Sequence, residues 1–188
     1  MMKIIAVISF LYLCSEFCLG GDPYYTAEWS DVIRSCPDFD NDRFSCDNLE
    51  LGSAPGSDDE DGGLSLRGML TFLADLEDGY TMDLQVSKCT EIGDEPVYNA
   101  QGDFCSSLQN TDTPWYPIVA AFNATSCPIP KADYPLDGLE ISLDFAKGVM
   151  THEFCGEYTA RLVMLDNTDM ISCHVVSLAV VEKFNDEE

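Results

Sequence analysis

Two stretches in the middle of the chain alternate regularly between apolar and polar side chains. The apolar positions are Leu64, Leu66, Leu70 and Phe72 in the first stretch, and Tyr80, Met82, Leu84 and Val86 in the second. A period of two places such side chains on one face of a β-strand. The segment Glu77-Asp78-Gly79 lies between the two stretches and is typical of a turn. We therefore expect the two strands to form a hairpin.

Three further strand patterns close the chain. Leu139, Ile141, Leu143 and Phe145 alternate with polar residues, and residues 158–165 and 171–182 are rich in strand-forming side chains. Turn-forming residues at 166–169 join the last two strands. The last strand is nearly continuous in apolar residues, which predicts that both of its faces are covered. With many strands and little helix, the chain is predicted to be an all-β, two-sheet antiparallel sandwich.

The region between these strand groups has a different period. Apolar residues recur there at spacings of three and four, which predicts two short helical turns. The residues concerned are Phe104 and Leu108 within 103–109, and Trp115, Ile118, Val119 and Phe122 within 114–122. Asp103 is a candidate helix cap and Pro114 a candidate first-turn residue. Their aromatic content suits a lid over an apolar cavity, and ordinary core packing explains it equally well.

The N-terminus has the pattern of a cleavable secretory signal. Lys3 precedes an apolar run that ends at Leu13, and small residues follow near Gly20. We expect residues 1–20 to be a signal peptide and residues 21–188 to form a single domain, with an acidic loop at 57–63. The protein is then secreted and extracellular, with lysosomal delivery as an alternative destination. No later stretch approaches the roughly 18 to 20 apolar residues that a membrane-spanning helix needs.

The cysteine content indicates a disulfide-linked domain. Of nine cysteines, Cys14 and Cys18 lie in the predicted signal, which leaves seven. Secretion exposes these thiols to an oxidising compartment, where pairing is the default. We expect three disulfides and one odd thiol. The wide spacing of the cysteines differs from the close pairs of a zinc site.

The charge of the chain limits its partners. The sequence has 34 acidic and nine basic residues, which gives a formal charge of -25. An acidic surface repels phosphates, which argues against nucleic acid and against anionic membranes as partners. The acidity mainly favours solubility.

The sequence has none of the common catalytic or metal-binding motifs. Its two histidines are His152 and His174, and His152-Glu153 is not followed by the second histidine of a zincin motif. The spacing of Asp38, Asp40 and Asp42 resembles the start of a calcium loop, but the required glycine and glutamate are missing. We therefore expect no enzyme activity, no cofactor and no metal site.

A sequon indicates a surface modification. Asn123-Ala124-Thr125 meets the rule for N-glycosylation in a secreted chain. Asn123 is therefore predicted to be exposed, while its neighbour Phe122 can still point inward.

Several segments together resemble the ML lipid-recognition domain, in particular an arthropod branch similar to the ganglioside activator. They are the stretches 127–136 (CPIPKADYPL), 139–145, 155–158 (CGEY), 73–80 (LADLEDGY) and 102–105 (GDFC). The resemblance runs from Cys36 to Glu182, nearly the whole predicted mature chain. Each motif alone is short, and their order and spacing carry the resemblance.

The resemblance implies an immunoglobulin-like sandwich whose sheets splay apart around an apolar cavity. It implies a monomeric carrier or presenter of a fatty-acid, sterol or glycolipid-type ligand, which needs shape and apolarity in its site and no reactive group. The expected lining residues are Leu66, Leu70, Phe72, Tyr80, Met82, Leu84, Phe104, Leu108, Trp115, Ile118, Val119, Phe122, Ile141, Leu143, Leu162 and Met164. The alternative is a sandwich with a filled core that acts through its surface as an extracellular interaction or immune-recognition module.

The resemblance also implies a disulfide pattern. It suggests pairs between Cys36 and Cys173, Cys89 and Cys105, and Cys127 and Cys155. Cys46 is then left over, and it is an alternative to Cys36 as the partner of Cys173.

Overall fold

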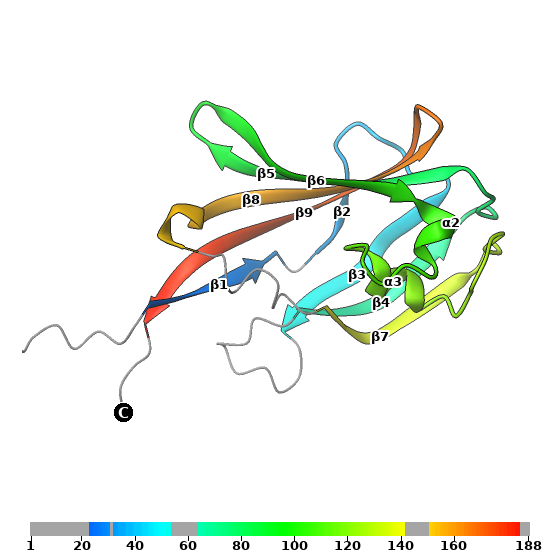
Figure 1. Ribbon diagram of the computed structural model, residues 1–188, viewed down its shortest axis with the longest axis horizontal. Coiled ribbons are helices and arrows are strands. Elements are labelled where there is room, and N and C mark those ends of the chain that lie inside the picture. Colours follow the sequence, from blue (N-terminus) through cyan, green and yellow to red (C-terminus); the bar gives the residue numbers. More distant parts are fainter. Residues whose placement is uncertain (1–22, 31, 54–63, 142–150, 185–188) are drawn as a thin grey trace, which may run out of the picture.

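A computed structural model describes residues 23–30, 32–53, 64–141 and 151–184. These residues form an all-β sandwich of two antiparallel sheets (Figure 1), which confirms the predicted fold class. The predicted signal peptide, the acidic loop at 57–63, and Leu143 and Phe145 lie outside the described residues.

The larger sheet has the strand order β1-β9-β8-β5-β6, and β2 also pairs with β9. Its strands are β1 (Pro23–Trp29), β2 (Arg34–Ser35), β5 (Tyr80–Thr90), β6 (Gly93–Asp103), β8 (Gly156–Asp166) and β9 (Asp169–Phe184). The predicted hairpin between the last two strands is confirmed, and Asn167 takes a left-handed conformation (φ 56°) at its turn. As predicted, β9 is covered on both faces, since the neighbouring Cys173 and His174 are both buried.

The smaller sheet has the order β3-β4-β7, formed by β3 (Phe44–Ser53), β4 (Leu64–Phe72) and β7 (Asp133–Ile141). The strand predicted to begin at Leu139 in fact begins at Asp133. Figure 1 shows the larger sheet extending well beyond the smaller one, whose strands lie below one end of it. The smaller sheet therefore covers only part of the inner face of the larger sheet.

The hairpin predicted between β4 and β5 is wrong. β4 pairs with β3 and β7, whereas β5 pairs with β6 and β8 in the other sheet. The predicted turn is present, with Gly79 at φ +100°, but it carries the chain from one sheet to the other. On the way, Leu76 exchanges backbone hydrogen bonds with Ile129 (2.8 and 3.0 Å). Alternation predicts which residues share a face, and it does not predict which strands pair.

Both predicted helical turns are present and short: α2 (Phe104–Ser107) and α3 (Tyr116–Ala120). The side chain of Asp103 accepts a hydrogen bond from the backbone N–H of Ser106 (2.7 Å), so its predicted capping role is confirmed. The prediction for Pro114 is wrong, because α3 begins at Tyr116 and the first-turn proline is Pro117.

Apolar clusters lie on both faces of the larger sheet. The main cluster lies between the two sheets, and a smaller one on the opposite face is formed by Cys36, Val163 and Cys173 with Phe39 packed against it. His174 points into the sandwich, where its ring meets the Phe44 ring edge-on (centroids 5.2 Å apart). Its Nε2 accepts a hydrogen bond from the backbone N–H of Cys46 (3.2 Å).

The disulfides agree only in part with those implied by the resemblance. Cys36 pairs with Cys173 as implied, which decides between Cys36 and Cys46. The second disulfide joins Cys105 to Cys127, so the implied pairs Cys89–Cys105 and Cys127–Cys155 are both wrong. Cys89 and Cys155 carry free thiols. The physical reason is that α2 and the segment before Ile129 lie side by side, whereas Cys89 lies near the far end of β5.

Two disulfides are typical of a chain that folds in an oxidising, extracellular-type compartment. None of the helices in the described parts of the chain is long and apolar enough to cross a membrane.

The cysteine pattern gives a first prediction. Peptide mapping of the non-reduced protein should recover Cys36 linked to Cys173 and Cys105 linked to Cys127. Alkylation before denaturation should label the exposed Cys89 and, more slowly, the half-buried Cys155. A peptide linking Cys89 to Cys105 would contradict the structure.

Candidate ligand-binding site

Fourteen of the sixteen residues of the expected lining belong to the main apolar cluster between the sheets. Ten of them are buried: Leu66, Leu70, Phe72, Met82, Phe104, Leu108, Trp115, Val119, Phe122 and Met164. Four are half-buried and pack against these: Tyr80, Leu84, Ile118 and Leu162. Ile141 is the last residue of β7, and Leu143 lies outside the described residues. The cluster therefore brings together residues from both sheets and both helices.

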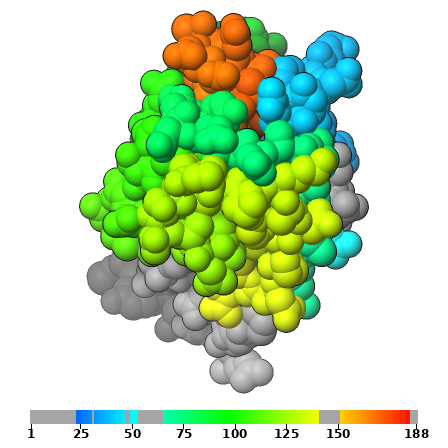
Figure 2. Space-filling model, turned by 90° about the vertical axis from the view of Figure 1, so that its right-hand side faces the viewer, coloured from blue at the N-terminus to red at the C-terminus, as the bar shows by residue number. Residues whose placement is uncertain are grey.

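One end of this cluster is packed ring against ring. The ring of Phe72, 1% exposed, lies 5.1 Å from Phe122, 5.2 Å from Tyr134 and 6.5 Å from Phe104, measured between centroids. Burial raises the pKa of the Tyr134 hydroxyl, and the nearby Asp75 raises it further. Figure 2 shows this end from outside, where the segment after β4 (turquoise), the helices (green) and the chain leading into β7 (yellow) form a continuous surface. These aromatic side chains fill the core here, so they are poor candidates for contact with a ligand.

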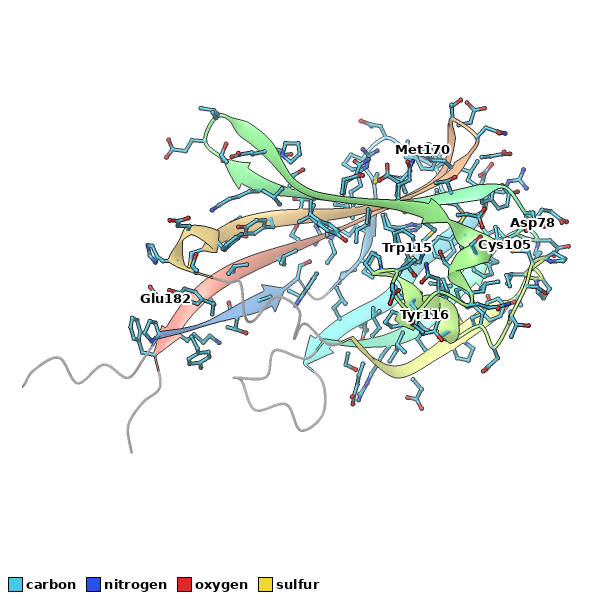
Figure 3. All side chains as sticks on the ribbon, viewed as in Figure 1. Asp78, Cys105, Trp115, Tyr116, Met170 and Glu182 are labelled. Atoms are coloured by element: carbon cyan, nitrogen blue, oxygen red, sulfur yellow. A yellow bond between two sulfur atoms is a disulfide. The ribbon has the colours of Figure 1, made fainter. Side chains whose placement is uncertain are left out.

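Trp115 holds the helical segment against the larger sheet. A Cβ atom added at Gly102 of β6 would lie 3.1 Å from Cζ2 of the Trp115 ring, so any other residue there would require the ring to shift. The indole Nε1 donates a hydrogen bond to Ser107 Oγ (2.8 Å). The Cys105–Cys127 disulfide adds a covalent link, and α3 contacts β7 of the smaller sheet. The helices therefore bridge β6 and β7, the edge strands of the two sheets (Figure 3).

Asp78, Cys105 and Cys127 form a group that could in principle hold a metal ion. Both sulfur atoms are, however, already joined in the disulfide. A disulfide sulfur lacks the thiolate charge that makes cysteine a metal ligand. Figure 3 labels Asp78 and Cys105 at the same end of the molecule as the helices.

Burial falls from Met82 and Met164 to the next two inward-facing pairs of β5 and β8. Met82 and Met164 are register partners in β5 and β8, and they are 4% and 2% exposed. The next inward-facing pair, Leu84 and Leu162, is only half-buried. The following pair, Val86 and Ala160, is half-buried as well. The inner face thus stays apolar but only half-buried over these two pairs, and Tyr158, the next inward residue of β8, is 6% exposed.

Apolar residues of other strands also pass from buried to half-buried. Leu136 of β7 is 3% exposed, whereas Leu139 on the same strand is half-buried. Val176 of β9 and Trp29 of β1 are half-buried and also pack against the main cluster. The Nε1 atom of Trp29 is buried and has no hydrogen-bond partner among the described residues. This half-buried apolar set, formed by Leu84, Leu162, Leu139, Val176 and Trp29, is called here the open-end set.

The sequence analysis missed Trp29 and Val176. Trp29 follows Tyr25 and Ala27 at spacings of two, which is a strand signal close to the predicted signal peptide. Val176 lies in an apolar strand whose two faces the sequence does not distinguish.

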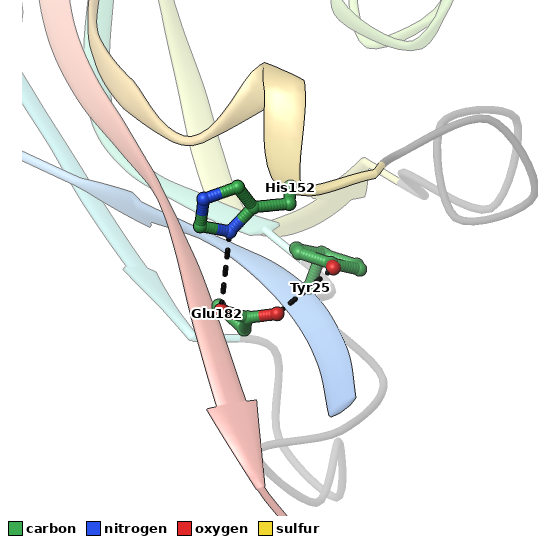
Figure 4. A network of polar contacts seen from close by, with 3 residues as sticks. All are labelled: Tyr25, His152 and Glu182. Atoms are coloured by element: carbon green, nitrogen blue, oxygen red, sulfur yellow. Dashed lines mark hydrogen bonds and ion pairs between the residues drawn. The ribbon is translucent and has the colours of Figure 1, made fainter. Parts of the chain in front are cut away.

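A polar network closes the outer end of the larger sheet. Tyr25 of β1 donates a hydrogen bond to Glu182 Oε1 of β9 (2.9 Å), and His152 Nδ1 lies 3.2 Å from Glu182 Oε2 (Figure 4). The hydrogen bond to Glu182 stabilises the neutral hydroxyl and raises the pKa of Tyr25. His152 belongs to the short 3-10 helix η1 (His152–Phe154) and its side chain is 79% exposed. Such an exposed contact positions η1 and contributes little to stability.

Comparison with known proteins finds little that is similar. No protein-family model matches this chain. No curated protein matches it either. Among solved structures, CsgH of R. palustris, determined in solution, is similar over 68% of this chain and 89% of its own, with 16% sequence identity and a TM-score of 0.24. This distant likeness assigns no function.

The fall in burial leads to a stability prediction. Phe72→Ala should lower the free energy of unfolding by about 3–5 kcal/mol, because it removes a buried ring that contacts four other aromatic rings. Leu84→Ala should cost only about 1 kcal/mol, because the Leu84 side chain already contacts water. Urea unfolding followed by circular dichroism measures both values. Equal losses at the two positions would show that the core is closed along its whole length.

Proposed function

We propose that the chain is a secreted, non-enzymatic protein that binds a lipid-like apolar molecule between its two sheets, as a carrier or presenter. The observation that carries the proposal is the open-end set, in which apolar side chains of both sheets remain half-buried beside a closed core. The resemblance to the ML domain supports the same function. The aromatic end of the cluster serves structure, so the proposed site includes Leu84 and Leu162 of the expected lining and excludes Phe72, Phe104 and Phe122.

The physical basis is the removal of apolar surface from water. Burial gains about 25 cal/mol for each Å² of apolar area. A hydrocarbon chain lying along Leu84, Leu162 and Leu139 would remove both its own apolar surface and theirs from water. Such binding needs no directional chemistry, and an apolar lining of this kind accepts many tails.

The remaining parts of the proposal have their own support. Secretion agrees with the two disulfides and with the signal-like N-terminus. The absence of catalytic motifs from the sequence supports a binding role. His174 is 2% exposed, and its Nδ1 lies 3.2 Å from Ser172 Oγ, so both of its ring nitrogens are engaged inside the protein.

A second candidate function is an extracellular interaction module. The ring-packed end of the core favours it, and so do exposed apolar side chains on the β5–β6 hairpin. Ile92 at the tip is fully exposed, and Val97 and Tyr98 are 50% and 51% exposed. In that case the open-end set would close on itself and hold no ligand.

A tryptophan placed in the open-end set tests the proposed function. Leu84→Trp should abolish displacement of a neutral fluorescent probe, N-phenyl-1-naphthylamine, by dodecanol, because the larger ring occupies the space proposed for the tail. The control is Gln85→Trp, the next residue along β5, whose side chain points to the opposite face. The control should bind as the unchanged protein does.

Two outcomes would count against this proposal. One is an unchanged protein that takes up no probe after its lipids have been extracted. The other is equal binding by the Leu84→Trp and Gln85→Trp variants, provided that circular dichroism shows both to be folded.

The sequon at Asn123 also belongs to the proposed secreted state. Asn123 is exposed just after α3 and has φ 52°, while Phe122 beside it is 8% exposed. Asparagine is among the few residues that adopt this left-handed conformation readily. Asn123 therefore ends the helix and presents its amide to solvent, where we propose that it carries an N-linked glycan.

Glycosidase treatment tests the glycan. Protein secreted by eukaryotic cells should lose mass when treated with peptide-N-glycosidase F. Asn123→Gly, which keeps the left-handed backbone accessible, and Thr125→Ala, which keeps Asn123, should each abolish that loss of mass. A glycan that persists in both variants would place the modification elsewhere.

A further inference from the structure

Lys88 places a positive charge at the end of the apolar inner face. It follows Met82, Leu84 and Val86 at successive inward-facing positions of β5, and its register partner in β8 is Tyr158. Four residues of strand separate Lys88 from Leu84, which corresponds to about 13 Å. A molecule lying along β5 would therefore meet first buried methionine, then half-buried aliphatic side chains, and finally an ammonium group.

The side chain of Lys88 is held in place. Its Nζ donates a hydrogen bond to the backbone oxygen of Glu153 in η1 (2.9 Å) and lies 5.6 Å from the centre of the Tyr158 ring. A Cβ atom added at Gly156 would lie 3.0 Å from Lys88 Cε. Gly156, with φ +142°, therefore leaves room for the lysine stem across the start of β8. An ammonium has three donors, and the contact with Glu153 uses one of them.

The positive charge of Lys88 is unusual because the chain is strongly acidic. The chain has nine basic residues against 34 acidic ones. Lys183 is paired with Glu28 (3.2 Å), whereas no carboxylate in the described ranges forms an ion pair with Lys88. Glu95 is its register partner in β6 and is exposed to solvent. Lys88 is thus a half-buried cation that faces the same side as the open-end set.

We infer that the ligand is an amphiphile with an anionic head group of the fatty-acid type. Its carboxylate accepts a hydrogen bond from Lys88 Nζ, and its tail lies along Val86 and Leu84 toward Met82. The inference rests on the proposed lipid-binding function and adds the head group and its direction. A charge-assisted hydrogen bond is about twice as strong as a neutral one, so the head group contributes selectivity as well as affinity.

The test compares two ligands that differ only in the head group. Dodecanoate and dodecanol compete for the lipid-extracted, full-length secreted protein loaded with N-phenyl-1-naphthylamine at pH 7. Because the probe is neutral, its own binding does not depend on Lys88. Dodecanol has the same tail and serves as the reference. The unchanged protein should bind dodecanoate with a dissociation constant about tenfold lower than that of dodecanol.

Three variants separate charge from structure. Lys88→Met should remove the preference for dodecanoate and leave dodecanol affinity within about twofold. Lys88→Arg should retain the preference, which shows that the site tolerates substitution. The control Lys131→Met makes the same change of net charge at an exposed position in the chain before β7, and both affinities should stay unchanged.

Each failure has a different meaning. If dodecanol and dodecanoate both bind but Lys88→Met keeps the preference for dodecanoate, the role of Lys88 is overturned and lipid binding stands. If the two ligands bind equally to the unchanged protein, the anionic head group is overturned. If neither displaces the probe, the proposed lipid-binding function itself fails.

Discussion

An apolar sheet face must be covered, and in this protein the covering sheet is smaller than the sheet it covers. Among the described strands, β3, β4 and β7 form a three-stranded sheet that lies against a six-stranded one. Near the helices the two sheets meet completely, and Leu70, Phe72 and Leu76 are at most 1% exposed. Farther along β5 and β8, the pairs Leu84–Leu162 and Val86–Ala160 are apolar and only half-buried. The closed core stabilises the fold, and the ligand site that we propose lies on the partly covered surface beyond it.

The covalent links lie on the closed part of the sandwich. Cys105–Cys127 ties the helical segment across the gap between the edge strands β6 and β7. Cys36–Cys173 lies on the opposite face of the larger sheet, beside Val163, whose register partner in β5 is Asp83. Both disulfides therefore lie near Met82, and no other disulfide joins the described parts of the strands beyond Leu84.

Local patterns predicted the strands well and their partners poorly. Residues 64–72 and Tyr80 to Val86 alternate so regularly that their inward faces could be assigned, and Asp103 was recognised as a cap. The pairing of β1 with β9 joins segments from the two ends of the domain, and no local signal specifies it. Strand β6 was missed because its residues are mostly exposed and include Pro96. The disulfide pairs could not be derived from spacing, because six cysteines already allow 15 connectivities.

The central claim is that the space beside the open-end set holds a guest molecule. Native mass spectrometry of the naturally secreted protein, purified without detergent, tests it most directly. The account predicts a population that is heavier than the glycosylated chain by the mass of one lipid. Extraction with organic solvent should remove this population, and the lipid should be identified in the extract. A spectrum that contains only the bare glycosylated chain, before and after incubation with excess fatty acid, would contradict it.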